Sequence, residues 1–511
     1  MNKRLLLIIL SAFLFSSPLV AQNSYRKGFI KDSMDNYINE ALTKWQIPGA
    51  AVCIVKDGKV VLMKGYGVKE LGKPDKVDEN TLFMIGSNTK AMTAVALAML
   101  QEDKKLSLDD QVTNYLPEFK LNNKLAGEQA TIRDLLSHRL GFGTFQGDFT
   151  YWTSNVSRQE VIQKMSLIKA LYPFRTTWGY NNAAFLTAGQ IIPKVTGQPW
   201  EVFVQERLFK PLGMTRTLAL SQELPAATNK AAAHTISEGK LIKIPYCVID
   251  NLSPAGSVSS SVNDMSKWVL ALLNKGKVGE QEVIPYRAIA TTIQPQSIVG
   301  NAYHPTSSNY ELYGLGWFLQ DYLGKRMFMH TGGVNGFVTS VTAVPGENLG
   351  IIVLTNTDQN NFYDALKWEI VDAYLKQPYR GYSDMAYAST IKSEATAQAK
   401  DKIIRDSVAL NLPSPLPLKA YTGTFTNELY GKATISPGKK NELRMHFEHH
   451  PNLIATLKPI AGNRFYVKFS DPTFGQSAVF PFLVQDGQVK GVRVKVADFV
   501  EYTPYVFTKV P

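Results

Sequence analysis

The spacing of hydrophobic and polar positions predicts helices and one hairpin in the first part of the chain. Residues 31 to 46 have a helical pattern. The run AAVCIVKDGKVVLMKGYG then contains two β-rich segments around Asp57-Gly58, which is a strong hairpin signal. Residues 84 to 100, MIGSNTKAMTAVALAML, predict an apolar helix that opens on polar residues, and residues 105 to 300 predict mostly helices separated by Gly and Pro.

Strand patterns return in the second half of the chain. Between residues 313 and 356, the runs YGLGWFLQ, RMFMHTG, FVTSVTAVP and LGIIVLTN are short and separated by turn residues. A helix over 361 to 376 closes this unit. We predict an α+β fold for residues 22 to 380, in which helices flank an antiparallel sheet built from both ends of the segment.

The C-terminal part has a different pattern. Residues 381 to 417 predict a polar, exposed helix and then a linker that Pro413, Pro415 and Pro417 stiffen. From 418 to 511, short stretches of alternating apolar and polar residues are separated by Gly, Asn, Asp and Pro. This pattern is typical of a small all-β barrel or sandwich, and we expect a separate accessory domain.

Chain length, charge and the N-terminal segment indicate how many domains the protein has, which partners it lacks and where it is located. A chain of 511 residues with 45% hydrophobic residues exceeds one ordinary domain. The 55 Lys+Arg against 43 Asp+Glu give a net charge of +12, but the charges are scattered, so we do not expect a nucleic-acid partner. Lys3 and Arg4 precede an apolar stretch that is too short to span a bilayer, and residues 1 to 21 predict a cleaved signal peptide.

We therefore expect export from a bacterial cell, to the periplasm or the medium, with no transmembrane segment after signal removal. Cys53 and Cys247 are the two cysteines, and we expect buried free thiols rather than a disulfide framework.

The first candidate for chemistry is the serine that opens the apolar helix. Ser-x-x-Lys occurs six times in the chain, but only Ser87 begins a long apolar helix, with Lys90 about one turn on along the same face. A serine needs a base within hydrogen-bond reach to act as a nucleophile. Lys90 can be that base if burial lowers its pKa, or it can stay charged and lower the pKa of another base. The alternative is a capping serine beside a solvated lysine.

The segment WGYNNAA supplies a second candidate group. Tyr180 and Asn182 form Tyr-x-Asn in a turn just before a helix. A tyrosine beside a lysine can ionise below its usual pKa and accept the serine proton, and an asparagine can bind a substrate amide and the lysine together. A packed aromatic residue remains the alternative for Tyr180.

The segment MHTGGVNGF supplies the third candidate group, because its residues suit the edge of a ligand-binding strand. His330, Thr331 and Gly332 lie on a predicted strand, and Gly333 has no side chain to keep the strand away from a ligand. Acyl transfer needs two N–H donors for the developing oxyanion. The candidate donors are the backbone amides of Ser87 and Gly333.

In this order, the three motifs resemble the class C β-lactamase and D-Ala-D-Ala carboxypeptidase family, which includes D-aminopeptidases and β-lactamase-like esterases. The resemblance covers about residues 31 to 376 and extends to LLSHRLGF, PLGM and AGSVSSSVNDMSKW, while the last hundred residues are similar to a small β domain found in some members. It implies a serine hydrolase without a cofactor that acts on a small molecule or peptide.

Carried over to this sequence, the resemblance assigns a role to each motif residue. Ser87 is the acylated nucleophile, and Lys90 and Tyr180 transfer protons. Asn182 binds the substrate amide and the lysine, and Gly333 donates to the oxyanion. The strand of His330, Thr331 and Gly332 binds substrate.

One residue departs from the family pattern. His330 stands where β-lactamases have lysine, and a histidine is only partly charged at neutral pH. We therefore expect weak β-lactam hydrolysis and peptidase- or esterase-like cleavage of amide or ester bonds, in peptidoglycan- or D-amino-acid-related substrates. An acyltransferase and a slow-turnover, penicillin-binding-like sensor are the alternatives, and the sequence does not indicate an oligomeric state.

Other histidines carry weaker signals. His138, at a helix end, has a mainly structural interpretation. In MHFEHH, a strand places His446, Glu448 and His450 on one face, where they could bind zinc, but an exposed polar face explains the pattern equally well and a metal-binding spacing is absent. We do not expect a metal site.

Overall fold

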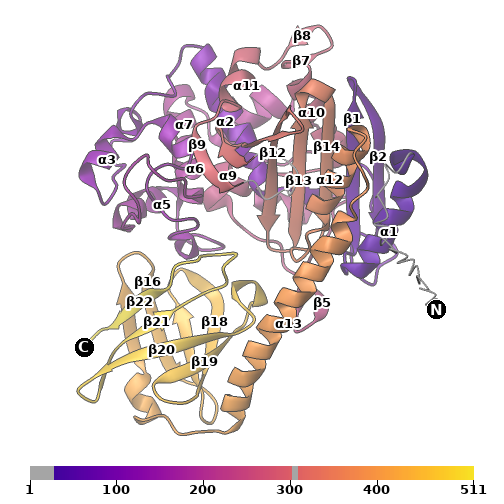
Figure 1. Cartoon of the computed structure of the whole chain (residues 1–511). Helices are drawn as coiled ribbons and strands as arrows, with labels where there is room; N and C mark the ends of the chain where they lie inside the picture. The colour runs from indigo at the N-terminus through magenta and orange to yellow at the C-terminus, as the bar shows by residue number, and fades with distance from the viewer. Residues whose placement is uncertain (1–27, 302–308) are drawn as a thin grey trace, which may run out of the picture.

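The structure, a computed structural model, describes residues 28–301 and 309–511 and has two lobes (Figure 1). The larger lobe is a sheet covered by helices, and the smaller lobe is a closed barrel. The predicted signal segment, residues 1 to 21, lies outside the described residues.

The large lobe contains an eight-stranded antiparallel sheet with the strand order β2-β1-β14-β13-β12-β11-β10-β9. The N-terminal hairpin pairs with the last strand of the lobe, with Cys53 opposite Ile352, so both ends of the lobe build the sheet. The predicted α+β fold is confirmed. The strands are β1 (Gly49–Lys56), β2 (Lys59–Gly67), β9 (Ser297–Asn301), β10 (Tyr310–Tyr313), β11 (Phe318–Tyr322), β12 (Lys325–Val334), β13 (Phe337–Val344) and β14 (Leu349–Thr355).

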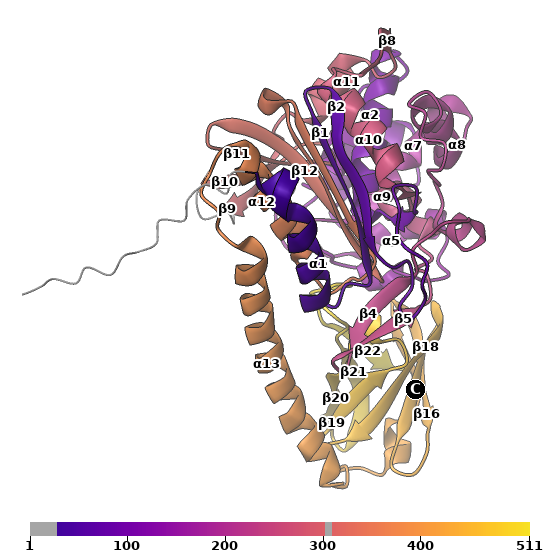
Figure 2. The ribbon, with the colours of Figure 1, turned by 90° about the vertical axis from the view of Figure 1, so that its right-hand side faces the viewer.

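Helices cover both faces of this sheet (Figure 2). Side chains alternate along a strand, so in β1 Val52 and Ile54 face one hydrophobic core while Ala51 and Cys53 face the other. Helices α1 (Met34–Lys44) and α12 (Phe362–Tyr374) cover the first face, and α2 (Thr89–Glu102) and α10 (Val262–Leu273) lie on the second. The other helices of the lobe are α3 (Lys124–Gln129), α4 (Ile132–Leu136), α5 (Arg158–Lys164), α6 (Asn182–Gly189), α7 (Ile191–Thr196), α8 (Trp200–Val204), α9 (Ser253–Gly256) and α11 (Tyr286–Thr292).

Helix α2 is buried on all sides. Every residue from Thr89 to Leu100 is buried, which matches a helix that is apolar around its whole circumference. Lys90 is the one charged residue in this buried stretch. Its position in the first turn places an ionisable group inside the core of the large lobe.

The small lobe is a closed barrel, as predicted for an all-β segment. The 28-residue helix α13 (Tyr382–Ala409), mostly exposed, runs from the sheet to the far end of the barrel (Figure 1). In order around the barrel, the strands are β15 (Gly423–Asn427), β16 (Gly431–Pro437), β17 (Leu443–Phe447), β18 (His450–Pro459), β19 (Arg464–Phe469), β20 (Ala478–Gln485), β21 (Gln488–Val494) and β22 (Tyr505–Lys509).

The barrel also packs directly on the large lobe. The Phe149 ring of the large lobe stacks on His450 at 4.4 Å between ring centroids and lies 5.3 Å from Phe447. The backbone N–H of Asn155 donates to the His449 carbonyl oxygen of the barrel at 3.0 Å. Helix α13 is therefore only one of the links between the lobes.

Short strands interrupt residues 105 to 300, the region that was predicted to be mostly helical. The hairpin of β4 (Ala233–Ser237) and β5 (Lys240–Ile244) is the largest. The others pair β3 (Phe83–Met84) with β6 (Ser259–Ser260), and β7 (Lys277–Val278) with β8 (Gln281–Glu282).

Cys53 and Cys247 are buried free thiols, which confirms the prediction. Within the described ranges, no helix is both long enough and apolar enough to cross a bilayer.

Candidate active site

Ser87 lies in a 3-10 turn, η2 (Gly86–Asn88), that leads directly into α2. The backbone of this turn lies against strand β12. A Cβ atom on Gly86 would be 3.0 Å from the Gly333 nitrogen, and one on Gly332 would be 1.8 Å from the Ile85 carbonyl oxygen. Only glycines permit this contact, which brings the candidate oxyanion donors, the amides of Ser87 and Gly333, to the same place.

The two glycines of β12 therefore have different neighbours. The prediction attributed close approach of a ligand to Gly333, but Gly332 is the residue that the backbone of the large lobe requires. A Cβ atom on Gly333 would be 3.2 Å from the ring of Phe499, which belongs to the small lobe. The C-terminal lobe thus reaches the strand beside Ser87.

Lys90 is in direct contact with Ser87. Its Nζ lies 3.0 Å from Ser87 Oγ, 2.7 Å from Asn182 Oδ1 and 2.8 Å from the Ala255 carbonyl oxygen. A neutral amine has two N–H donors and one lone pair. It can donate to the two carbonyl oxygens and accept the hydroxyl proton of Ser87, which is the arrangement that a general base requires.

The surroundings of Lys90 favour its neutral form. The side chain is fully buried, at 0% exposure, and lies over the faces of Tyr180 and Phe185, with Nζ 4.6 and 5.5 Å from the ring centroids. Burial lowers the pKa of Lys90 well below its usual value, and the nearby charge of Asp148 opposes this shift. Burial is the larger influence, so the structure favours the base among the two predicted roles.

Asn182 connects Lys90 to a buried carboxyl group. Asn182 opens α6, where the side chain of Asn181 caps the helix by accepting from the Ala184 N–H at 2.9 Å. Asn182 Nδ2 donates to Asp148 Oδ2 at 2.5 Å. Burial raises the pKa of Asp148 to about 8. Asp148 was not predicted, because it lies in the aromatic run FQGDFTYW, which has no recognisable motif.

Tyr180 is buried beside Lys90, in surroundings that favour a protonated hydroxyl group. Burial raises the pKa of Tyr180 well above its usual range, although a hydrogen bond with Ser87 opposes the shift. The sequence left open whether Tyr180 ionises beside the lysine, and in the free protein burial favours the protonated form. Proximity to a lysine favours the phenolate, but Lys90 faces the Tyr180 ring, and desolvation of the hydroxyl is the larger effect.

His330 is neutral rather than partly charged. It is 1% exposed, its Nε2 lies 3.1 Å from the Tyr313 hydroxyl, and its Nδ1 lies 2.6 Å from the Thr331 carbonyl oxygen. Burial lowers the pKa of His330 to about 3, and a proton on Lys90 would act in the same direction. The partial positive charge expected from the sequence is thus absent at neutral pH, because the expectation took no account of burial.

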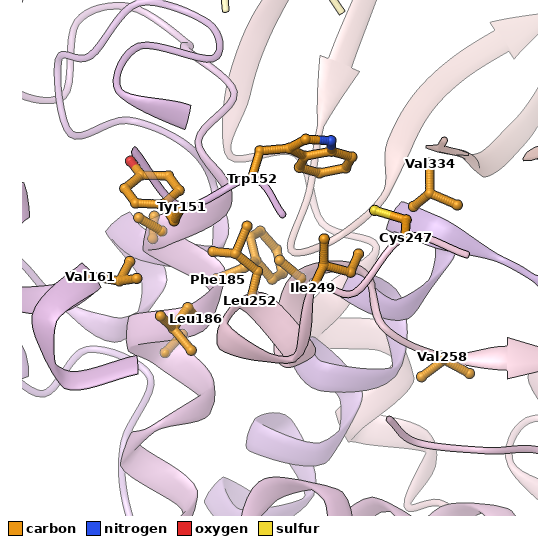
Figure 3. Packing of buried hydrophobic residues seen from close by; sticks show 14 of the residues in the cluster. Tyr151, Trp152, Val161, Phe185, Leu186, Cys247, Ile249, Leu252, Val258 and Val334 are labelled. Carbon is orange, nitrogen blue, oxygen red and sulfur yellow. The ribbon is translucent and has the colours of Figure 1, made fainter. Parts of the chain in front are cut away.

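Ser87, Tyr180 and His330 border a cavity of about 430 Å³ with mostly aromatic walls. The small lobe contributes two rings: Phe499 packs edge-on against Trp152 at 5.7 Å, and Tyr502 stacks on Phe145 at 5.6 Å. Figure 3 shows Trp152 above the buried side chains of Phe185, Ile249 and Leu252. The cavity is lined by Ser87, Thr144, Phe145, Trp152, Trp178, Tyr180, Asn182, Phe318, His330, Thr331, Gly333, Phe499 and Tyr502.

The remaining histidines lie outside this constellation. His138 is buried with its ring 4.4 Å from that of Tyr180, and its Nδ1 accepts the Asn181 N–H at 3.1 Å, so it supports the turn that carries Tyr180.

The suggested zinc trio does not share one strand face. A turn after Phe447 ends β17 and separates the three residues. His446 is exposed on β17, whereas Glu448 accepts the Lys432 N–H and His450 is buried against Phe149. In the part of the chain that the structure describes, no cluster of three or more His, Cys, Asp or Glu residues could hold a metal ion.

The fold and the site together define a serine hydrolase of the β-lactamase-related type. Residues 34–376, more than half of the chain, match the sequence model described as Beta-lactamase. The chain therefore belongs to the Beta-lactamase family. Residues 409–509 match a second model, described as a domain of unknown function (DUF3471).

Individual relatives agree with this assignment. The Unguisins hydrolase ungD of Aspergillus violaceofuscus is 29% identical over 464 residues, which cover 84% of this chain and 81% of the relative.

Two solved structures share the fold. The octameric penicillin-binding protein homologue from Pyrococcus abyssi aligns with a TM-score of 0.61 and 20% identity over 93% of this chain and 99% of that chain. A D-stereospecific amidohydrolase from Streptomyces aligns with a TM-score of 0.53 and 22% identity over 63% of this chain and 94% of that one.

Proposed function

We propose that this protein cleaves amide or ester bonds of uncharged, apolar substrates through an acyl-enzyme on Ser87. One observation carries the proposal: a fully buried lysine lies 3.0 Å from the serine oxygen, and its three polar contacts belong to uncharged groups. A relative that is named a hydrolase supports a hydrolytic reaction.

Acylation begins when Ser87 Oγ attacks the substrate carbonyl carbon. The hydroxyl proton moves to Lys90 Nζ, and the resulting ammonium is stabilised by the carbonyl oxygens of Asn182 and Ala255. The carbonyl oxygen becomes an oxyanion, which accepts hydrogen bonds from the amides of Ser87 and Gly333. Removal of one such donor typically costs about a hundredfold or more in rate.

Tyr180 completes the proton transfer to the leaving group. When the tetrahedral intermediate collapses, the C–N or C–O bond breaks, and the leaving nitrogen or oxygen takes the Tyr180 hydroxyl proton. Lys90 returns its proton to Tyr180. Water then attacks the ester on Ser87 by the reverse sequence of proton transfers, which releases the acid and restores the free hydroxyl group.

The composition of the pocket supports an uncharged substrate. Its lining residues, all in the described part of the chain, include no Lys or Arg, and His330 is neutral because burial lowers its pKa to about 3. An anion in such a site has no partner for its charge, which is costly when water is excluded. Penicillins and peptides with a carboxylate beside the scissile bond are therefore poor substrates.

The protein is exported in this proposal. The support is the basic pair Lys3 and Arg4 before a short apolar stretch at the N-terminus, as in secretory signals. Detection of the mature protein in the periplasmic fraction or the medium, with its N-terminus near residue 22, tests the proposal. Retention of the intact N-terminus in the cytoplasm would contradict it.

Intact mass after reaction with a fluorophosphonate tests the nucleophile. We expect one adduct on the wild type and none on Ser87→Ala. Ser166→Ala is the matched control, because Ser166 begins another Ser-x-x-Lys match but its hydroxyl only donates to the Gln163 carbonyl. Equal labelling of Ser87→Ala would refute the mechanism.

Two esters of similar size test the substrate class. We expect p-nitrophenyl butyrate to turn over at least about tenfold faster, in kcat/KM, than mono-p-nitrophenyl succinate, whose acyl chain ends in a carboxylate. A stoichiometric burst without turnover would instead indicate a slow acyl-enzyme, and conjugates formed with a dilute added alcohol would indicate a transferase.

A further inference from the structure

A glutamate of the small lobe is buried against the large lobe. Glu501, in the segment between β21 and β22, is 0% exposed. Its Oε1 accepts the Gly147 N–H at 2.8 Å and the Tyr430 hydroxyl at 2.6 Å, and its Oε2 accepts the Phe149 N–H at 3.2 Å. A buried carboxyl group is costly unless hydrogen bonds compensate for the lost water. Here the donors come from both lobes.

The two amides that Glu501 holds flank Asp148. Gly147 has a φ of +90° and precedes a 3-10 turn, η4 (Asp148–Thr150), whose first N–H groups have no partner within the turn. Glu501 accepts from this end of the turn. Asp148 accepts from Asn182, and Asn182 accepts from Lys90. A continuous series of contacts therefore extends from the barrel to the amine beside Ser87.

We propose that Glu501 is a positioning residue for catalysis: by fixing the turn at residues 147 to 149, it holds Asp148 and Asn182 where they orient Lys90 toward Ser87. This inference rests on the proposed function, because it assigns Glu501 to the same reaction. It makes the barrel part of the catalytic unit, although Glu501 itself touches no reacting atom.

The ionisation of Glu501 provides a second readout of this role. Asp148 and the tyrosines Tyr151, Tyr430 and Tyr505 face it, and Lys495 is the nearby cation. Burial raises the pKa of Glu501 to about 7. The carboxylate has more acceptor capacity than the acid, so it holds both backbone amides best above that pH. The positioning effect should weaken as the pH falls through 7.

The experiment compares Glu501→Gln and Glu501→Ala with Tyr430→Phe in the full chain. Tyr430→Phe is the matched control, because it removes one hydrogen bond to the same carboxylate from within the barrel and leaves both backbone contacts in place. We measure the rate constant of fluorophosphonate labelling at Ser87, kcat and KM for p-nitrophenyl butyrate, and thermal unfolding. The pH profile of labelling is recorded from pH 5 to 9.

For Glu501→Ala we expect about a tenfold loss in the labelling rate and in kcat, with KM within twofold, since small displacements of catalytic groups cost rate more than binding. Glu501→Gln, which keeps one acceptor oxygen, should fall between the wild type and the alanine variant and lose the inflection near pH 7. Tyr430→Phe should stay within twofold of the wild type.

Labelling rates of both Glu501 variants within twofold of the wild type would overturn the inference. An equal loss of labelling rate in Tyr430→Phe would also overturn the inference, because the loss would then result from disturbed packing within the barrel. If Glu501→Ala does not fold, Glu501→Gln decides the question alone. A wild type that is not labelled at Ser87 would instead refute the proposed function.

Discussion

The two walls of the pocket are built on different principles. On the large-lobe wall, Ser87 and Asn182 are both contacted from behind by Lys90, whose Nζ lies 3.0 Å from Ser87 Oγ and 2.7 Å from Asn182 Oδ1. On the small-lobe wall, Phe499 and Tyr502 contribute aromatic rings that pack on other rings. The first wall needs particular functional groups at fixed distances, whereas the second needs mainly bulk and shape. Substitutions on the two walls should therefore affect different kinetic constants.

The largest expected effect is at Lys90, which lies behind the large-lobe wall and contacts Ser87. We expect Lys90→Met to lower kcat by about a thousandfold or more, because the serine loses its base, while KM changes little. Lys90→Arg should be as inactive, since a guanidinium does not give up its proton at neutral pH. Pre-steady-state release of p-nitrophenol measures the acylation step directly.

The corresponding control is Lys367→Met. Lys367 is also buried, at 3% exposure, and lies over the aromatic face of Trp368, but it contacts the carboxylate of Asp364 and is on the other side of the sheet. We expect kcat within about threefold for any folded Lys367→Met protein, because that lysine has no contact with Ser87. Comparable losses at both lysines would mean that Lys90 acts through stability rather than as a base.

The next effect, at Tyr180, should depend on the leaving group. Tyr180→Phe removes the hydroxyl that protonates the leaving atom, and general acid help is typically worth about a hundredfold. We expect a loss of that size for an amide, whose nitrogen must be protonated before it leaves. For a p-nitrophenyl ester, whose leaving group is stable as an anion, the loss should be below about tenfold.

Steady-state rates with p-nitroanilide and p-nitrophenyl ester substrates of the same acyl group provide this measurement. Equal losses for the two would remove Tyr180 from the proton-transfer pathway and leave it as part of the aromatic wall.

The large-lobe wall carries no charge at His330 at neutral pH. His330 has a folded pKa of about 3, and an unfolded histidine has a pKa near its usual 6.5. Between these values the unfolded chain binds a proton that the folded protein does not. The contribution of His330 to the free energy of unfolding therefore rises with pH between these two values and decreases as the pH falls.

The glutamine of the His330→Gln variant cannot be protonated, so the variant should lack this pH-dependent contribution to stability. Between pH 6.5 and 4.5, the wild type should lose about 2 kcal/mol more stability than the variant, since each pH unit corresponds to about 1.4 kcal/mol. Urea unfolding at the two pH values measures the difference, and the other histidines cancel because both proteins contain them. Parallel pH dependence would mean that His330 is charged in the folded protein.

The sequence grouped Ser87, Lys90 and Asn182 as candidate site residues, and the structure brings them together, because chemistry restricts their residue types and helical spacing places Lys90 beside Ser87. Ser87 and Lys90 are one turn apart, and the hairpin at Asp57-Gly58 and the strand runs carry clear periodic signals. The ionisation states of Tyr180 and His330 were not predictable, because they depend on burial, which proximity in the sequence does not reveal.

The contribution of the small lobe to the site could not be predicted. Glu501 lies 354 residues from Gly147, and nothing in its local pattern indicates the contact, which forms only when the lobes dock. The β4–β5 hairpin was missed for a related reason: its two five-residue strands pair with each other outside the large sheet, so their pattern is short.

The smallest expected effects belong to the small-lobe wall. Phe499 lies beside Gly333 and Trp152, so Phe499→Ala should enlarge the pocket next to the oxyanion donors without moving them. We expect kcat within about twofold and KM for p-nitrophenyl butyrate raised roughly fivefold to tenfold, the equivalent of one or two buried methylene groups. The shorter acetate ester, which reaches less of the wall, should show a smaller increase.

Tyr502→Ala provides the comparison within the same wall, and its effect should be smaller than that of Phe499→Ala. Tyr502 is 52% exposed and stacks on Phe145. Its replacement by alanine should therefore remove less apolar contact with a substrate than the replacement of Phe499. A KM increase of about twofold fits this position. A loss in kcat rather than KM for either variant would contradict the division between the two walls, because it would place an aromatic side chain of the barrel among the groups that control the chemical step.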